Sequence, residues 1–276
     1  SGLSLGVEGI WLSPIFTSPS YHKYDVLDYM DVDPQYGTLE DMRDLVAACH
    51  EKGIRVIIDL PVNHTSTRHP WFLSAVESIQ KRTCDSPYMD YYCFTQAPTG
   101  NKYVKVSGSD WHYEEQFAGG NMPDLNLHNE AVLAELKDII TFWLTDVNVD
   151  GFRLDAVTSF HAADVAENVA TLDKIKAMCE AAKPGSYVVG EAWVGQSALA
   201  EYWQSTVDSF FLFPASQAEG FIVKSILGRS PDATKYVKGL ETALELLPED
   251  TKLICLGTRE PREPAAWTTI HKGGIP

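Results

Sequence analysis

Two acidic residues follow short apolar runs and could act together on a sugar. Asp155 lies in the segment GFRLDAV (151–157), and Glu191 ends the run VVGE (188–191). Arg153 and Asp155 alternate with apolar residues, so in a strand both side chains point to the same side. Two carboxylates at neighbouring strand ends are what glycosidic bond cleavage needs, because one attacks the anomeric carbon and the other protonates the leaving oxygen. A separation of roughly 5–5.5 Å between them would give retention of configuration.

Neighbouring residues predict different protonation states for the two carboxylates. The positive charge of Arg153 is expected to favour the ionised form of Asp155. Glu191 has to carry a proton when it acts as an acid, and desolvation by the ring of Trp193 is expected to favour that form. A single Asp or Glu at a strand end is more often a helix cap or an ion-pair partner. The interpretation therefore depends on these segments jointly, together with DLPVNHTS (59–66), in which an apolar strand leads into Asn63 and His64.

The elements that position these residues form repeated β/α units. Thr38 is placed to cap a helix whose apolar face runs from Leu39 to Cys49, and Gly53 is placed to end it. Further helices are predicted at 132–144 and at 164–182. More helices are predicted between the strand expected at 208–213 and about residue 247. Strands are expected at 7–13, 55–60, 151–154, 187–190, 208–213 and 252–256.

Parallel strands joined by helices fit either a doubly wound sheet or a barrel. The first strand lacks the Gly-rich phosphate turn of a dinucleotide-binding fold, and polar residues gather at the ends of several strands. This arrangement favours an α/β fold of the (β/α)8 TIM-barrel type. Between residues 67 and 121 the alternation stops, and an excursion this long predicts an inserted subdomain. We therefore predict barrel segments at 1–66 and 122–256, an inserted domain at 67–121 and an irregular tail at 257–276.

Composition excludes several other classes of protein. The chain of 276 residues is 45% hydrophobic, which supports a large core and argues against intrinsic disorder. The 22 Lys and Arg residues against 38 Asp and Glu residues give a net charge of −16, which disfavours nucleic acid as a partner. No apolar run is long enough for a membrane span, and no signal peptide is visible. Localisation and oligomeric state stay open.

The cysteines indicate neither a zinc site nor a disulfide framework. There are five, an odd number, and no pair has the two-residue spacing typical of zinc ligands. Only Cys84 and Cys93 are close enough in sequence to suggest a loop-closing bridge. Buried free thiols are the favoured interpretation.

The segments together resemble the α-amylase family of glycoside hydrolases, glycoside hydrolase family 13, from about Gly6 to about Pro248. The resemblance implies a (β/α)8 barrel with a B domain inserted after the third strand. Four further segments carry it: SPSYHKYDVLDYMDVDPQYGT (18–38), HPWF (69–72), SPYMDYY (86–92) and MPDLN (122–126).

The resemblance also implies roles for individual residues. Asp155 matches the nucleophile, Glu191 the general acid/base and Arg153 the guanidinium that orients the nucleophile. Tyr24 matches the aromatic platform under the sugar, and His22 and His64 match histidines that bind its hydroxyls. Asn63 and Asp124 match side chains that bind a structural calcium ion, which prefers oxygen ligands. The substrate class implied is starch, maltodextrin or isomaltooligosaccharide.

The chain departs from the family pattern in three ways. No Asn-His-Asp run follows Glu191, and the Lys-His pair common after the nucleophile is replaced by Thr158 and Ser159. The first strand, the eighth strand and a C-terminal β-domain have no counterpart, so the barrel is expected to be incomplete. Loss of the third catalytic Asp is expected to cost several orders of magnitude in rate. A retaining α-glucan hydrolase is the first hypothesis; a non-catalytic binding or scaffold relative and an inactive fragment are the alternatives.

Overall fold

The computed structural model describes residues 6–119, 121–162, 164–216, 220–226 and 233–247, and the backbone of 254–256 and 268–270. The chain forms two compact units. The first contains residues 1–155 with 177–186, and the second contains residues 156–176 with 187–276. The boundaries predicted after residues 66, 121 and 256 divide the chain differently and stay predictions.

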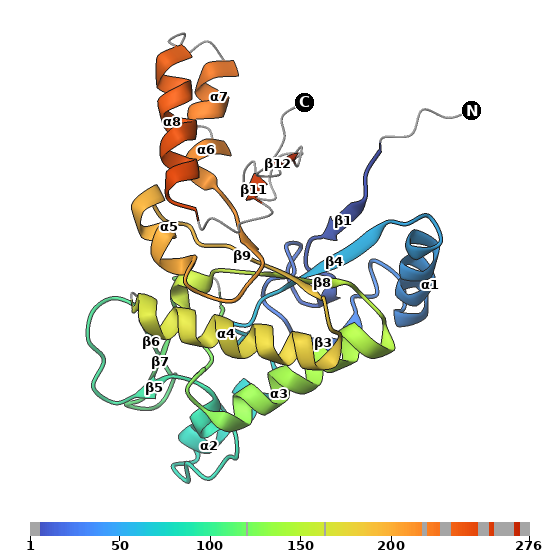
Figure 1. The fold of residues 1–276 in the computed structure, drawn as a ribbon. Coiled ribbons are helices and arrows are strands. Elements are labelled where there is room, and N and C mark those ends of the chain that lie inside the picture. The colour runs from blue at the N-terminus through green and yellow to red at the C-terminus, as the bar shows by residue number, and fades with distance from the viewer. Residues whose placement is uncertain are drawn as a thin grey trace. The chain divides into compact units, whose positions relative to one another are not determined.

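A parallel sheet forms the centre of the first unit (Figure 1). Within this unit the sheet contains β1 (Gly9–Leu12), β4 (Arg55–Leu60) and β8 (Gly151–Leu154), paired in that order. β4 is a run of apolar and β-branched residues. Val56, Ile58 and Leu60 on one face and Asp59 on the other are fully buried, as expected for a strand covered on both faces. The prediction of parallel strands joined by helices is confirmed here.

Helices and short strands surround this sheet. α1 (Leu39–His50) begins at Thr38, whose side chain and that of Asp41 form a reciprocal capping box, and Gly53 follows the helix with a φ of +72°. Both boundary predictions are therefore confirmed. The other elements of the first unit are β2 (Phe16–Thr17), β3 (Asp28–Val32), α2 (Pro70–Gln80), η1 (Met89–Tyr91), β5 (Phe94–Thr95), β6 (Tyr103–Lys105), β7 (His112–Glu114), α3 (Glu130–Thr141) and η2 (Phe142–Asp146).

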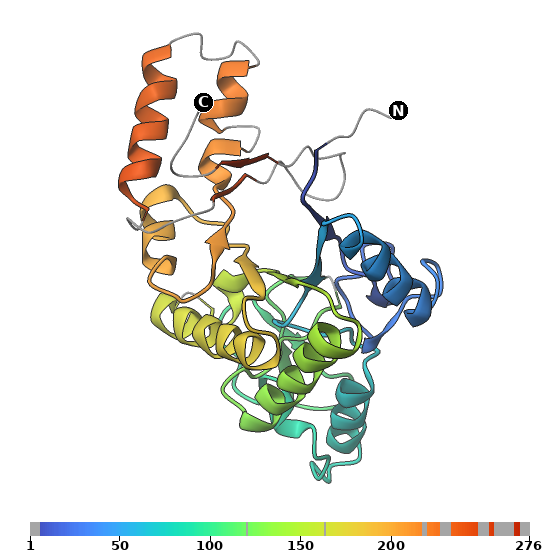
Figure 2. The ribbon, with the colours of Figure 1, turned by 45° about the vertical axis from the view of Figure 1, so that its right-hand side comes forward.

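The second unit is built around two parallel strands. These are β9 (Tyr187–Gly190) and β10 (Ser209–Phe210), which pair with Gly190 opposite Phe210. The helices α7 (Phe221–Ile226) and α8 (Ala233–Glu245) lie side by side in Figure 2. The remaining elements are η3 (Val157–Ser159), α4 (Val165–Ala182, which ends in the first unit), α5 (Gln196–Tyr202), α6 (Phe213–Ser216), β11 (Ile254–Leu256) and β12 (Thr268–Ile270).

Several predicted elements differ from the structure in length or kind. The strand expected at 208–213 ends at Phe210, and α6 begins at Phe213. The prediction extended the strand too far because a run of aromatic residues does not distinguish a strand from a buried helix. The excursion at 67–121 contains the 11-residue helix α2. β12 lies in the tail that was predicted to be irregular, where it pairs with β11.

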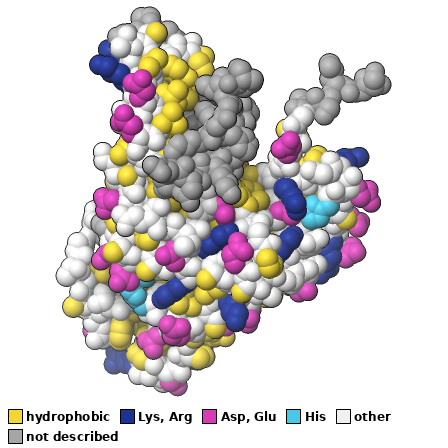
Figure 3. Space-filling view, in the orientation of Figure 1, with side chains coloured by type: hydrophobic (Ala, Val, Ile, Leu, Met, Phe, Trp, Pro, Cys, Tyr) yellow, Lys and Arg dark blue, Asp and Glu magenta, His cyan; other side chains and the backbone are white. Residues whose placement is uncertain are grey.

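The surface and the thiols agree with the composition. On the face drawn in Figure 3, basic side chains lie scattered among acidic ones. Cys84 and Cys93 are free thiols, as predicted, but Cys84 is exposed, so the prediction of burial is wrong for this residue. None of the described helices combines the length and apolar character needed to cross a bilayer.

Asp150 joins the beginnings of β4 and β8. Its carboxylate accepts from the Val56 backbone N–H at 2.8 Å and contacts His50 Nε2 at 2.7 Å and Arg55 Nη1 at 3.0 Å. Burial by itself would raise the pKa of Asp150, but these hydrogen bonds outweigh it and lower the pKa below its usual value. The ionised carboxylate therefore stabilises the sheet.

We expect Asp150→Asn to lower the free energy of unfolding by about 2 kcal/mol at pH 7, because buried partners lose a charged acceptor. Since the folded pKa lies below the unfolded one, this contribution is full above about pH 5 and is lost progressively as the pH falls below the unfolded pKa of about 4 and through the lower folded pKa. Urea unfolding at pH 7 and at pH 3 measures both values. The exposed Asp146→Asn is the control, and an equal effect of the two substitutions would contradict the assignment.

Candidate active site

The carboxyl ends of β4 and β8 bring two charged residues together in the first unit. The strands pair in parallel with Asp59 opposite Arg153, so both side chains project from the same level of the sheet. Asp59 is fully buried, and Arg153 is 4% exposed. A buried guanidinium requires carboxylate partners close by, because an unpaired buried charge is costly.

One terminal nitrogen of the Arg153 guanidinium donates hydrogen bonds to two carboxylates. Arg153 Nη1 donates to Asp59 Oδ1 at 2.8 Å and to Asp155 Oδ1 at 2.5 Å. Asp155 follows β8 directly and is 8% exposed. Two negative charges therefore share one positive charge, and the orientation of the Asp155 carboxylate is set by Arg153. This matches the prediction that Arg153 and Asp155 point to the same side.

Aromatic rings enclose the guanidinium. Arg153 Cζ lies 5.6 Å from the ring centre of Trp11 on β1 and 5.8 Å from that of Tyr24, distances suited to cation–π contact. The Tyr24 hydroxyl donates to Asp59 Oδ2 at 3.3 Å. The ring of His22 stacks on that of Tyr24 at 6.0 Å. The structure thus brings together four of the predicted residues: His22, Tyr24, Arg153 and Asp155.

His64 is held as a buried, neutral imidazole. Burial lowers the pKa of His64, while the negative charges of Asp155 and Asp25 oppose that shift. Its Nδ1 lies 3.3 Å from Asn63 Nδ2. Its Nε2 is buried and has no hydrogen-bond partner among the described residues, so it can accept or donate one further hydrogen bond, depending on the tautomer.

Asn63 and Asp124 meet in a cluster rich in acidic oxygen atoms. Asn63 Nδ2 donates to Asp124 Oδ1 at 2.9 Å, and the Gln116 backbone N–H donates to Asp124 Oδ2 at 3.0 Å. Burial, followed by the charge of Glu114, raises the pKa of Asp124 to about 8, and Glu115 adds to the effect. Crowded carboxylates of this kind fit a hard cation such as Ca²⁺, with Asn63 turned to present its carbonyl oxygen.

Glu191 comes directly after β9 in the second unit. The backbone N–H of Ala156 donates to Glu191 Oε2 at 3.1 Å, and that of Val157 donates to the Glu191 carbonyl at 3.2 Å. Ala156 is the residue after Asp155 in the chain, and its φ of +49° is rare for a residue with a side chain. A turn in this unusual conformation aims a backbone donor at the acidic side chain.

The residues around Glu191 also restrict the end of β9. A Cβ at Gly190 would come within 2.6 Å of the Phe210 ring, so glycine is needed just before Glu191. The ring of Trp193 stacks on Phe213 at 5.0 Å and is half exposed. The expectation that Trp193 desolvates Glu191 therefore stays a prediction, as does the meeting of Asp155 and Glu191 across one sugar.

Comparison with known proteins places this geometry in a family. The family model of the alpha-amylase catalytic domain matches residues 3–233. The chain belongs to the alpha-amylase family. "Alpha-amylase 3" of Dictyoglomus thermophilum is 42% identical over 214 residues, which are 77% of this chain and 41% of that protein. An oligo-1,6-glucosidase of Parageobacillus thermoglucosidasius is 38% identical in an alignment of 165 residues that covers 55% of this chain and 28% of that protein.

Solved structures of the alpha-amylase family show the same fold. Eubacterium rectale Amy13B superposes with a TM-score of 0.82 at 40% identity, covering 91% of this chain and 50% of that one. The alpha-amylase from H. orenii gives a TM-score of 0.76 at 39% identity, covering 88% and 49%. The predicted fold class, an α/β fold of the (β/α)8-barrel type, is confirmed. The chain spans about half the length of these relatives.

The structure adds residues to the alpha-amylase-family site that the sequence interpretation missed. Asp59 carries the second carboxylate on Arg153, and Trp11 supplies a ring beside it. The signal for Asp59 was present in the sequence, because an Asp inside the apolar run RVIIDL needs a buried partner. Nothing local marks Trp11, whose contact with Arg153 depends on the tertiary fold.

We expect Asp59→Asn to lower the free energy of unfolding by about 2 kcal/mol, because the buried Arg153 guanidinium loses one of its two charged acceptors. Urea unfolding followed by far-ultraviolet circular dichroism measures the loss. Asp44→Asn, on the exposed side of α1, is the matched control and should change stability by less than about 0.5 kcal/mol. A similarly small effect of Asp59→Asn would mean that the buried pair contributes nothing.

Proposed function

We propose that the protein is a retaining α-glycoside hydrolase acting on α-glucans or maltooligosaccharides. The observation that carries the proposal is the Arg153 guanidinium, which fixes the carboxylate of Asp155 at the carboxyl end of β8. Functional residues of barrel enzymes lie at this end of the strands. Membership of the alpha-amylase family supports the substrate class, as do the names of two relatives, an alpha-amylase and an oligo-1,6-glucosidase.

In this proposal Asp155 attacks the anomeric carbon while Glu191 protonates the leaving glycosidic oxygen. A covalent glycosyl ester forms on Asp155 and the glycosidic bond breaks. Glu191, now ionised, takes a proton from water, which attacks the same carbon, releases the sugar with retained configuration and frees Asp155. Arg153 keeps the attacking oxygen oriented, and Asp59 keeps Arg153 in place.

Tyr24, His22 and His64 would bind the sugar itself. Tyr24 and His22 stack and offer aromatic faces, and the buried Nε2 of His64 is available for a hydroxyl group. A neutral imidazole suits this task because it pairs with an uncharged hydroxyl without requiring a counter-ion.

A calcium ion is the proposed structural cofactor. Asn63 and Asp124 would hold it, and Glu114 and Glu115 add negative charge nearby. The ion would neutralise carboxylates that repel one another. It would also connect the segment after β4, through Asn63, to the segment around β7. It takes no part in bond cleavage.

A non-catalytic carbohydrate-binding relative is the alternative. The sequence raises this alternative because no Asn-His-Asp run follows Glu191 within the 276 residues given. Arg153, Asp155 and Glu191 are all present and favour the enzyme. Binding without turnover is what separates the two hypotheses.

Turnover of a chromogenic maltooligosaccharide tests the enzyme hypothesis. We expect Asp155→Asn and Glu191→Gln each to lower kcat by at least about 10³-fold, because each removes a member of one catalytic unit. Asp138→Asn, exposed on α3, should leave kcat unchanged. Sugar binding by the wild-type chain without any turnover would refute the enzyme hypothesis and support the binding relative.

Thermal unfolding with added Ca²⁺ tests the cofactor. We expect Ca²⁺ to raise Tm and a chelator to reverse the increase, because an ion that binds only the folded state stabilises it by mass action. Asp124→Asn should abolish the Ca²⁺-dependent increase, whereas Asp138→Asn should keep it. A wild-type Tm that is the same with Ca²⁺ and with chelator would count against the ion.

A further inference from the structure

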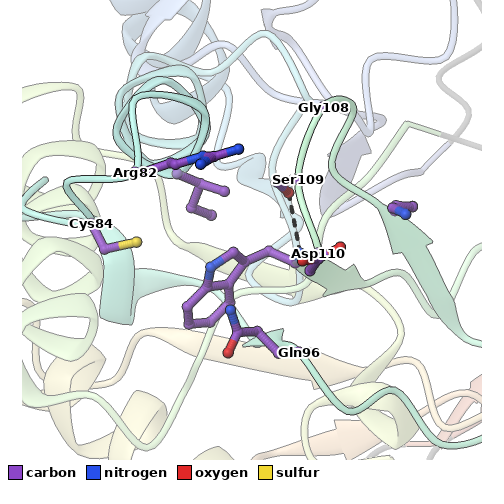
Figure 4. A pocket seen from close by; sticks show the side chains of 9 residues that line it. Arg82, Cys84, Gln96, Gly108, Ser109 and Asp110 are labelled. Carbon is purple, nitrogen blue, oxygen red and sulfur yellow. Dashed lines mark hydrogen bonds between the residues drawn. The ribbon is translucent and has the colours of Figure 1, made fainter.

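A pocket in the first unit lies among residues that the proposed reaction does not use. Its volume is about 650 Å³, within the range of small-molecule sites. Figure 4 shows Arg82, Cys84, Gln96 and Asp110 placed around the hollow. We call it the Trp111 pocket. The side chains that matter here are Arg82, Cys84, Gln96, Lys105, Asp110 and Trp111.

Four polar side chains of this pocket are not engaged with the protein. Within the described part of the chain, the side chains of Arg82, Gln96, Lys105 and Asp110 form no hydrogen bond or ion pair. Their neighbours do pair: Gln80 Nε2 donates to the Ser107 carbonyl at 3.1 Å. The pocket therefore offers guanidinium, amide and ammonium donors together with amide and carboxylate acceptors.

Trp111 gives the pocket a fixed apolar surface. Its backbone N–H donates to Ser109 Oγ at 3.1 Å, drawn as a dashed line in Figure 4, and its carbonyl accepts from the Val106 N–H at 2.8 Å. Gly108, with a φ of +77°, makes this tight turn possible. The half-buried indole stacks on no other aromatic ring among the described residues, so a ligand can cover it.

We propose that the Trp111 pocket binds a neutral oligosaccharide, a second site for the α-glucan chain. A sugar ring has an apolar face of C–H groups, which suits the indole, and an edge of hydroxyl groups, which suits planar side chains such as those of Gln96, Arg82 and Asp110. The choice of α-glucan rests on the proposed function. The site itself rests on the lining residues.

The charges of the pocket favour a neutral ligand over an anion. Arg82 and Lys105 are positive, but Asp110 shares the same rim. The chain as a whole carries a net charge of −16, which repels anions at long range. Hydroxyl groups can pair with all three charged side chains, whereas an anion would face the carboxylate of Asp110.

The exposed thiol of Cys84 reports directly on occupancy of the pocket. The experiment uses the full chain carrying Asp155→Asn, so that the sugar is not consumed, and measures N-ethylmaleimide addition at Cys84 by peptide mass spectrometry. We expect maltotriose to slow this reaction, about tenfold at about ten times its Kd. The partly buried Cys93 is the internal control, and its rate should not change.

Three variants locate the ligand on the indole. Trp111→Ala should remove the protection of Cys84, Trp111→Phe should keep it, and Gln96→Ala should weaken it, with circular dichroism confirming that each variant is folded. Protection that persists in Trp111→Ala would overturn the proposal, as would a Cys84 rate unaffected by maltotriose up to its solubility limit. Protection by inorganic phosphate in place of maltotriose would overturn it in favour of an anion site.

This test is separable from that of the proposed function. Trp111→Ala in the otherwise wild-type chain should leave turnover of a short chromogenic substrate unchanged. Absence of turnover together with maltotriose protection of Cys84 would reject the enzyme and keep the pocket. Turnover without protection would keep the enzyme and reject the pocket.

Discussion

A single buried guanidinium shared by two carboxylates is the interaction on which the first unit of this protein depends. Arg153 pairs with Asp59 on the neighbouring strand and with Asp155 two residues further along its own strand. The arrangement requires β4 and β8 to pair in one register, because a slip of one residue would turn Asp59 to the other side of the sheet and leave Arg153 with an exposed or missing partner. The cost of burying charge thus ties sheet register to the orientation of the proposed nucleophile.

The cost of burying charge also explains why aromatic rings, and not water, surround Arg153. Trp11 and Tyr24 cover the guanidinium, excluding water, and in a less polar environment each ion pair is stronger. Three charges buried together leave an excess of one negative charge. The attack proposed for Asp155 would use that excess, since a sugar that develops positive charge at its anomeric carbon is stabilised by it.

The apolar strands could be predicted from the sequence because their signal is local. The runs at 55–60, 151–154 and 187–190 are short, rich in β-branched or apolar residues and bounded by turn residues, and the structure has β4, β8 and β9 at those bounds. β2 and β3 could not be predicted in this way. They contain two and five residues, carry polar side chains, and exist through pairing with each other.

The site residues likewise divide into those that local spacing predicts and those that depend on the tertiary fold. Arg153 and Asp155 could be paired from a two-residue spacing, which is a local property of strands. Asp59 is buried because of a partner 94 positions away in the chain, and only the tertiary fold supplies that partner. The Trp111 pocket is even harder to predict from the sequence. Polar residues are ordinary in a turn-rich segment, and only their convergence on one hollow, with no protein partner for the side chains of Arg82, Gln96 and Lys105 among the described residues, distinguishes a binding surface from a solvated loop.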